Sequence, residues 1–252
     1  LYHENAGREK ENNEMTQDRP TPLMLKQICF FQDLEEAELE SVARDMWIEH
    51  LRRGHPLGGR KPGQDSPFLD TAYFVFRGVV ALYSETLRGR RKILFFQGAG
   101  QLLNLNVMAS CGDSHYGEAA ADAILLCMER HRLEKLVRQE PRLAAALLTH
   151  YETKLWRLSH QLKNSAGVMF AERKLAGKLL KLASDFGKDQ ETGRVIPFDL
   201  TITQLADYIG IPRETVSRAA GKLTELGLIS YENRRFCIPD VKALERFRRQ
   251  AD

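Results

Sequence analysis

Residues 202–221, which read ITQLADYIGIPRETVSRAAG, constrain the fold of this chain more than any other stretch. Two short helices that cross steeply need a small residue at their contact and a residue that tolerates positive φ in the turn; Ala206 and Gly210 meet these needs. Thr201 and Gln204 have the spacing of a capping box at the start of the first helix. Apolar residues recur on the side that would face a shared core, namely Leu205, Ile209, Ile211, Val216 and Ala219. The pattern predicts a helix-turn-helix.

A β-hairpin is predicted directly after this motif. Two strand-like runs, Leu226–Tyr231 and Arg235–Ile238, flank the turn-rich residues Glu232–Arg234. A helix-turn-helix followed at once by a hairpin is a winged helix. Its basic tip, with Arg234, can reach a phosphate.

The outward side of the second helix is predicted to carry Arg213, Glu214, Ser217 and Arg218. An arginine in the DNA major groove can donate to guanine O6 and N7 together, a glutamate can accept from cytosine N4, and a serine can bond phosphate or touch thymine. A carboxylate close to phosphates is repelled, so Glu214 favours base readout over general adhesion. A solvated face with an ion pair between Glu214 and Arg218 is the plainer interpretation, and such a pair is compatible with base contact.

Short strand-like runs rich in aromatic and β-branched residues precede this region and are separated by glycines. They are Ala72–Phe76, Val79–Tyr83 and Lys92–Phe96, with Ala121–Met128 as a further strand. Leu23–Glu49 has the apolar spacing of short helices. Several short strands at regular spacing predict a β-barrel or jelly roll.

A long helix is predicted from about Pro141. Its apolar residues alternate at three and four positions, the spacing of a two-helix coiled-coil seam. The seam consists of Leu148, Tyr151, Leu155, Leu158, Leu162, Ser165 and Met169. We expect this helix to form a homodimer; the alternative is a monomeric helix lying on its own sensor domain. A second helix, Ala171–Asp185, ends at Gly187, and 188–194 is predicted to be a loop.

These patterns predict an α+β chain in four parts: 1–22, disordered or vector-derived; 23–140, a β-barrel sensor domain; 141–168, a dimerisation helix; and 169–252, a winged helix-turn-helix domain. The net charge of +3 comes entirely from Met169 onward, where a polyanion would dock. No apolar run approaches the roughly 18 residues that span a bilayer, and the N-terminus has no secretory apolar core. We therefore expect a cytoplasmic protein without membrane contact.

With these motifs in place, the chain resembles the Crp/Fnr family of bacterial regulators over about residues 23–245. Ile211–Arg218 and Leu226–Ile229 are the most specific matches. The resemblance implies a cyclic-nucleotide-binding-like jelly roll, a long dimerisation helix and a winged helix that regulates transcription at palindromic DNA, with RNA polymerase as a possible further partner.

The recognition residues refine this expectation. Glu214, Ser217 and Arg218 together are similar to those of the oxygen-responsive branch, which implies a half-site near TTGAT. By the same likeness, Arg213 would contact phosphate or an outer base, and Thr203 and Thr215 would hold the DNA backbone.

The effector is left open by the sequence. Members that bind cyclic nucleotides cradle the phosphate with an arginine, whereas Gly98–Gly117 contains none, so we do not expect cyclic AMP. Members with an iron-sulfur cluster use an N-terminal cysteine cluster, of which only Cys29 could be a remnant, so we do not expect that cofactor either. Haem is possible, and its candidate ligands are His50, His55, His115 and His150. A small organic effector between barrel and dimer helix, or redox chemistry at a cysteine, is equally open.

The sequence also bears on the class of protein, namely whether the chain is an enzyme, a regulator or a binding module. The four cysteines are scattered singly, without a C-x-x-C pair, and are expected to be reduced and mostly buried. No G-x-G-x-x-G, P-loop, H-E-x-x-H or nucleophile elbow is present, so an enzyme is not expected. The rival reading is a ligand-binding or haem-binding sensor module whose helical C-terminus serves protein contacts.

Overall fold

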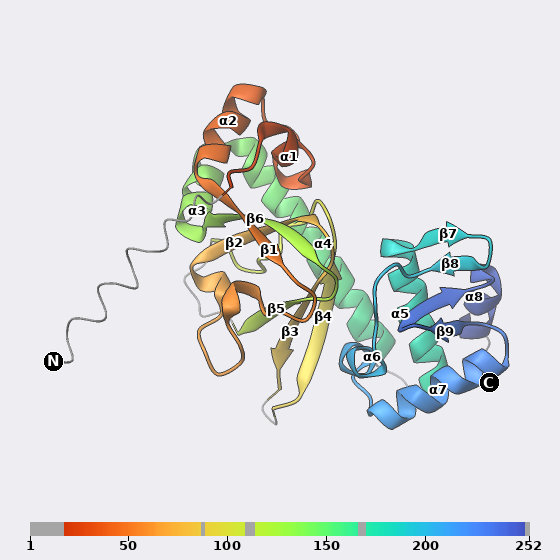
Figure 1. The fold of residues 1–252 in the computed structure, drawn as a ribbon. Helices are drawn as coiled ribbons and strands as arrows, with labels where there is room; N and C mark the ends of the chain where they lie inside the picture. The colour runs from red at the N-terminus through yellow and green to blue at the C-terminus, as the bar shows by residue number, and fades with distance from the viewer. Residues whose placement is uncertain (1–17, 87–88, 109–113, 166–169, 250–252) are drawn as a thin grey trace.

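The computed structural model describes residues 18–86, 89–108, 114–165 and 170–249, and the side chains of 163–165 are outside this description. The chain is an α+β protein in which one long helix runs from an N-terminal β-rich part to a C-terminal part of helices and a small sheet (Figure 1). Over these ranges no helix is both long enough and apolar enough to cross a bilayer.

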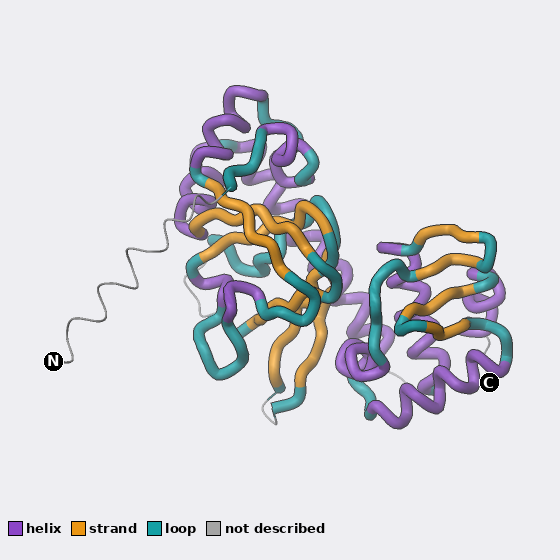
Figure 2. Tube along the Cα trace, viewed as in Figure 1, coloured by secondary structure: helices purple, strands orange, loops and turns teal. Residues whose placement is uncertain are grey.

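Two antiparallel sheets of three strands face each other in the N-terminal part (Figure 2). Their orders are β1-β6-β2 and β4-β3-β5. The strands are β1 (Met46–Leu51), β2 (Thr71–Arg77), β3 (Val80–Glu85), β4 (Arg91–Gln97), β5 (His115–Ala119) and β6 (Ala123–Glu129). Aromatic and aliphatic side chains such as Phe95, Leu125 and Val75 fill the space between the sheets. The arrangement is a jelly roll, as predicted, but it is an open two-sheet sandwich rather than a closed barrel.

The three strand runs predicted between residues 72 and 96 are confirmed as β2, β3 and β4, and the run 121–128 as β6. Met46–Leu51 is a correction, because residues up to Glu49 were predicted to be helical and form β1 instead. This strand pairs along its whole length with β6, from Met46 opposite Met128 to Leu51 opposite Ala123. A partner so distant in sequence leaves no local signal, and long-range pairing overrides the local pattern.

Short helices cover one end of the sandwich. They are α1 (Pro22–Lys26), η1 (Cys29–Phe31), α2 (Glu36–Arg44) and α3 (Arg130–Gln139), with η2 (Leu57–Gly59) and η3 (Pro67–Leu69) in the loops. The predicted disordered segment 1–22 extends too far: the Asp18 carbonyl accepts from the Ile48 amide at 2.9 Å, and α1 begins at Pro22. Residues 1–17 are outside the described residues.

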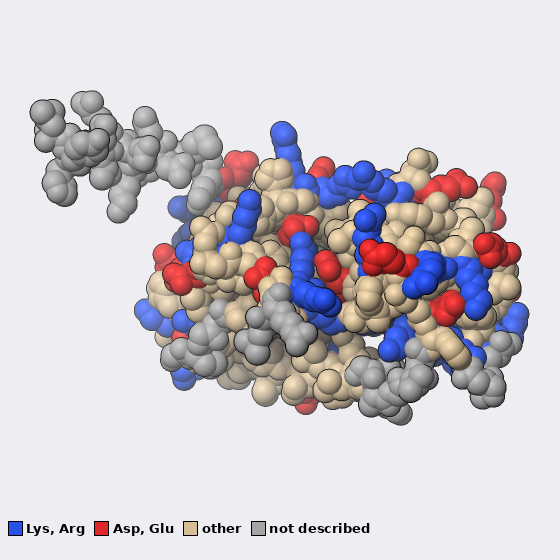
Figure 3. Space-filling model, turned by 90° about the horizontal axis from the view of Figure 1, so that it is seen from below, with Lys and Arg blue, Asp and Glu red and all other residues tan. Residues whose placement is uncertain are grey.

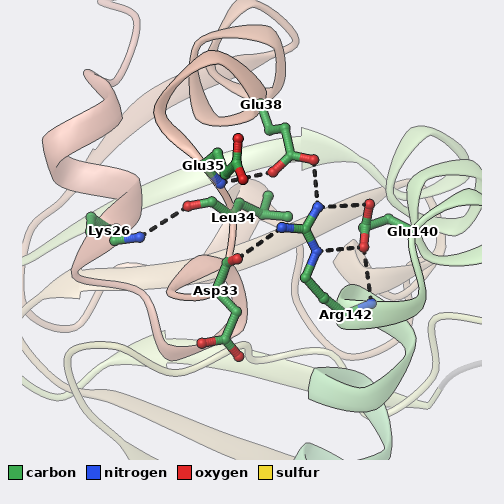
Figure 4. Close-up of polar contacts among 7 residues, drawn as sticks. All are labelled: Lys26, Asp33, Leu34, Glu35, Glu38, Glu140 and Arg142. Atoms are coloured by element: carbon green, nitrogen blue, oxygen red, sulfur yellow. Dashed lines mark hydrogen bonds and ion pairs between the residues drawn. The ribbon is translucent and has the colours of Figure 1, made fainter.

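Arg142 ties this helical end to the long helix α4 (Pro141–Ser165). Its guanidinium donates to the carboxylates of Glu38 and Glu140 and, at 3.1 Å, to the carbonyl of Asp33 (Figure 4). Hydrogen bonds from Arg142 hold the pKa of Glu140 down at about 2. The start of α4 is thereby fixed to α2 and to the loop before it.

One side of α4 lies on its own sandwich. The Tyr151 hydroxyl accepts from the Val107 amide at 2.9 Å, and the Gln161 amide donates to the Leu94 carbonyl at 3.2 Å. Lys154 is only 6% exposed, and its ammonium lies 4.7 Å from the centroid of the Phe95 ring. Burial lowers the pKa of Lys154 to about 7.

The C-terminal part packs four helices and a sheet of order β7-β8-β10-β9 around one apolar core. Its elements are α5 (Ala171–Phe186), β7 (Lys188–Gln190), β8 (Gly193–Val195), α6 (Ile202–Ile209), α7 (Arg213–Glu225), β9 (Ser230–Glu232), β10 (Arg235–Ile238) and α8 (Val241–Arg249). The predicted helix over 171–185 is confirmed as α5. The predicted loop 188–194 is wrong, because β7 and β8 form a hairpin there whose second strand pairs with β10. The hydrogen bonds of β8 with β10 stabilise these strands, although their polar sequence has no strand-like apolar pattern.

The turn between α6 and α7 has the predicted geometry. Gly210 ends α6 with φ 86° and ψ 34°, and its amide donates to the Ala206 carbonyl at 2.7 Å. The capping box is present as well: the Gln204 amide donates to the Thr201 hydroxyl at 3.1 Å, and the Gln204 side chain accepts from the Thr201 amide at 3.0 Å.

The apolar core of the C-terminal part is continuous with the outer face of the β4-β3-β5 sheet. Phe96 on β4 lies 5.8 Å from Phe198 and 5.1 Å from Tyr208, measured between ring centroids. The Lys92 ammonium, also on β4, donates to the Tyr208 carbonyl at 2.8 Å, at the C-terminal end of α6. The jelly roll therefore holds the helix-turn-helix directly.

His150 makes stability depend on pH. Its Nε2 donates to the Asn104 carbonyl at 3.1 Å, and burial, together with the nearby charge of Lys154, lowers its pKa from 6.5 to about 4. The unfolded chain binds more protons between these values, so the free energy of unfolding rises with pH across that window, by up to roughly 1 kcal/mol per pH unit. In urea denaturation at a series of pH values, His150→Gln should flatten this rise. An unchanged slope would contradict the assignment.

Two glycines of the helix pair should respond oppositely to alanine. Gly210→Ala places a Cβ in left-handed backbone and should lower the free energy of unfolding by roughly 1–2 kcal/mol. Gly221→Ala lies within α7, where an added Cβ would meet no atom within 4 Å, and should raise it by roughly 0.5–1 kcal/mol. Chemical denaturation of both variants measures the change in the free energy of unfolding. Changes of the same sign would contradict the assignment of Gly210 to a left-handed turn and Gly221 to a helix interior.

Candidate nucleic-acid interface

The outward side of α7 is open to solvent. Arg213, Glu214, Ser217 and Arg218 are all exposed, whereas the opposite side of the helix is buried in the C-terminal core. The buried residues are Val216, Ala219, Ala220 and Leu223. This division follows from the helical period, and it leaves the four polar side chains on one accessible strip.

The charged groups of this strip are unpaired within the part of the chain that the structure describes. No ion pair joins Glu214 to Arg218 there, although their spacing would allow one. Glu214 lies in the first turn of α7, where the helix dipole favours a negative charge. Both carboxylate and guanidinium are therefore available to an external partner with a pattern of donors and acceptors.

Two threonines flank the strip. Thr203 is exposed on the first turn of α6, and Thr215 is half-buried in the first turn of α7. Hydroxyl and amide groups at helix N-termini are common donors to phosphate oxygens. The two residues lie where they could contact a backbone while α7 contacts bases.

The predicted hairpin is confirmed as β9 and β10, which pair from Ser230 opposite Cys237 to Glu232 opposite Arg235. Asn233 and Arg234 form its tip, with φ of 50° and 62°. Two successive residues with positive φ are the signature of a type I′ turn, whose twist matches that of the strands. Arg234 is exposed at this tip, as a wing residue needs to be.

Basic and acidic side chains are interspersed on the face that includes α7 (Figure 3). Lys222, for example, pairs with Glu172 at 3.1 Å, which ties α7 to α5. A purely electrostatic contact with a polyanion would be served better by a continuous basic surface. The mixed surface fits a partner that is read through specific side chains.

A second exposed surface lies along α4. Leu148, Leu155 and Leu162 stand at seven-residue intervals and are 66%, 64% and 69% exposed. We call these three residues the leucine strip. Trp156, 58% exposed, stacks beside it on His160 with ring centroids 4.0 Å apart. Large apolar side chains in a row on one side of a helix are typical of a helix-helix contact.

Two other predicted seam residues do not lie on the exposed side of α4. Tyr151 and Leu158 are half-buried and pack against their own jelly roll, in its two separate cores. The side chain of Ser165 and the whole of Met169 are outside the described residues. The two alternatives for α4 are therefore compatible, because one side of the helix lies on its own sensor and the other is exposed.

The candidate cofactor ligands lie on separate elements. His50 is on β1, His55 in the loop after it, His115 on β5 and His150 on α4. Within the described ranges, no three His, Cys, Asp or Glu side chains gather as a metal site. Cys127 and Cys237 are buried and Cys29 is exposed, while Cys111 is outside the described residues. Burial raises the pKa of the Cys127 thiol, which makes it a poor redox nucleophile.

No local sequence pattern predicts the contact between Lys92 and Tyr208. These residues are 116 positions apart, and the alternation of β4 groups Lys92 with Leu94 and Phe96 without indicating a partner in α6. Lys178 of α5 adds to it, with its ammonium 3.9 Å from the centroid of the Tyr208 ring.

Comparison with known proteins agrees with this geometry. Residues 173–247 match the model of the Crp-like helix-turn-helix domain. A CRP-like cAMP-activated global transcriptional regulator of Mycobacterium tuberculosis is 24% identical over 88% of this chain and 97% of its own length. The nitrogen fixation regulation protein FixK of Rhizobium meliloti is 26% identical over 79% of this chain and 92% of its own.

Among solved structures, FixK2 from Bradyrhizobium japonicum superposes with a TM-score of 0.68 and 22% identity, covering 82% of this chain and 99% of FixK2. The order of jelly roll, long helix and winged helix is thus shared over nearly the whole of the relatives. The proteins of this group are regulators rather than enzymes. The C-terminal part is therefore a Crp-like helix-turn-helix domain, and over most of its length the chain is similar to transcription regulators of the Crp/Fnr group.

Proposed function

We propose that this regulator binds, as a homodimer in the cytoplasm, a palindromic DNA site with half-sites near TTGAT. In this proposal residues 23–140 sense a small effector, 141–168 form the dimerisation helix and 169–252 bind DNA. The observation that carries it is the exposed strip of Arg213, Glu214, Ser217 and Arg218 on α7, supported by its opposite, fully buried side.

Each side chain has a role in this proposal. Arg218 donates to a guanine, Glu214 accepts from a cytosine N4, and Ser217 touches a thymine or its phosphate. Arg213 contacts phosphate or an outer base. The backbone of the half-site is held by Thr203, Thr215 and Arg234 of the wing.

The leucine strip supplies the dimer contact, and its occupant is a second copy of the same helix. A two-fold axis along α4 brings Leu148, Leu155 and Leu162 of both copies together and leaves each Tyr151 and Leu158 on its own sandwich. Dimerisation then sets the two α7 helices in successive major grooves, about 34 Å apart. RNA polymerase is a further partner in this proposal, reached once the dimer is on DNA.

An effector acts by favouring the dimer in which the two α7 helices have the correct spacing. Haem, a small organic ligand and a cysteine redox signal are distinguished by the absorption spectrum and the mass spectrum of the purified protein.

Arg218→Ala should weaken binding to the cognate palindrome by about 1–3 kcal/mol and remove the preference at one guanine, because a bidentate contact is lost. Fluorescence anisotropy with the TTGAT palindrome and single-base variants measures both effects. Arg249→Ala, at the exposed end of α8, is the matched control and should leave the base preference unchanged. A loss that is equal on every sequence would reassign Arg218 to phosphate, and no preference in the wild type would favour the protein-contact module.

Leu155→Glu should convert the dimer to monomers, because it buries two charges at the centre of the leucine strip. Sedimentation velocity measures the mass, and operator affinity should fall with it. Leu23→Glu is the control, since Leu23 is 73% exposed on α1 and is not part of the leucine strip. A dimer that persists in Leu155→Glu would exclude the leucine strip as the interface.

A further inference from the structure

A cavity of about 560 Å³ lies where the jelly roll, α4 and the C-terminal part meet. Its walls come from the β2–β3 turn, the segment after β4, Arg157 of α4, and the chain from the end of α5 to Phe198. Its volume is in the range of roughly 300–1,000 Å³ that small-molecule sites occupy. None of the proposed DNA-contacting or dimer-contacting residues lines it.

Positive charge predominates in the lining. Arg77, Arg157 and Lys188 contribute cations, against the single carboxylate of Asp185. Asp185 is already engaged by Lys181, whose ammonium lies 2.5 Å from it, while the Arg157 guanidinium lies 3.7 Å away. That distance is too long for a strong hydrogen bond, so Arg157 retains donors for an anion.

The rest of the lining has two further properties. Phe96, Phe186 and Phe198 form an aromatic wall, with the Phe186 and Phe198 rings perpendicular at 5.5 Å. The Gln101 Oε1 atom is buried and has no hydrogen-bond partner among the described residues. Buried acceptors are almost always satisfied, so this oxygen calls for a donor.

We infer that this cavity binds a small amphipathic organic anion with an aromatic body, a carboxylate held by Arg157 and Arg77, and a hydroxyl that donates to Gln101. The aromatic body lies against the three phenylalanines. Sensor residues and C-terminal residues contact the same molecule, so the ligand stabilises their docking.

Hydroxynaphthoate is the test probe, and hydroxynaphthamide is its neutral counterpart. The binding of each to the full-length protein is followed by its effect on backbone amide resonances. We expect saturable shifts at Ala99 and Ala121, which line the cavity, with at least tenfold weaker binding of the amide. Arg157→Gln and Arg77→Gln should each weaken hydroxynaphthoate binding severalfold and leave amide binding unchanged, and Gln101→Leu should weaken both.

Arg132→Gln is the matched control, because Arg132 forms its ion pair with Asp45 on the far side of the sensor and should bind the probe as the wild type does. Arg77 forms no ion pair among the described residues, so its variant remains informative if Arg157→Gln is unstable. Shifts that fall instead at Leu94 and Gln161, or equal affinity for acid and amide, overturn the inference.

Control of DNA binding by this ligand rests on the proposed function, and the two are separable. Arg218→Ala should lose DNA preference while it binds hydroxynaphthoate normally. Failure of the probe to bind overturns the cavity site alone, whereas failure of the palindrome to bind overturns the DNA proposal alone.

Discussion

The shared apolar core between the jelly roll and the helix-turn-helix is the constraint on which the rest of this structure depends. Phe96 inserts between Phe198 and Tyr208, and Lys92 bonds the end of α6. Because this contact holds α6 by its inner side, α7 is left with its polar strip outward. Phe96 and Phe198 of this contact also line the cavity, so the placement of α7 and the formation of the cavity have one physical origin.

Local chemistry explains which parts of the site were predictable. The α6–α7 pair requires a capping box at Thr201, a left-handed residue at Gly210 and apolar residues at helical intervals, and all three are written within twenty consecutive residues. The wing has a turn signal of the same kind at Asn233. Short-range rules suffice there because the hydrogen bonds concerned join residues three to four positions apart.

What sequence could not supply depends on partners far along the chain. β1 is a strand because β6 lies beside it, and β7 and β8 are strands because β10 completes their sheet. The heptad pattern of α4 predicts a helix with an apolar seam. It does not predict that Tyr151 and Leu158 pack on the jelly roll while the leucine strip is exposed, because apolar residues at one helical period can serve two different contacts. The hydrogen bond of Lys92 with the end of α6 likewise cannot be predicted from neighbouring residues in the sequence.

Because α4 packs on its own jelly roll with one side and exposes the leucine strip on the other, it would couple the two subunits of a dimer as the effector concentration rises. A rotation of the helix that relaxes Tyr151 against its own sandwich also turns Leu155 against the neighbouring copy, which must then turn with it. A dimer with one subunit switched and the other not would have a higher free energy, because the two leucine strips would no longer fit each other. If an effector binds each subunit of such a dimer, occupancy of one subunit would favour the same change in the other, and the response would be steeper than that of an independent subunit.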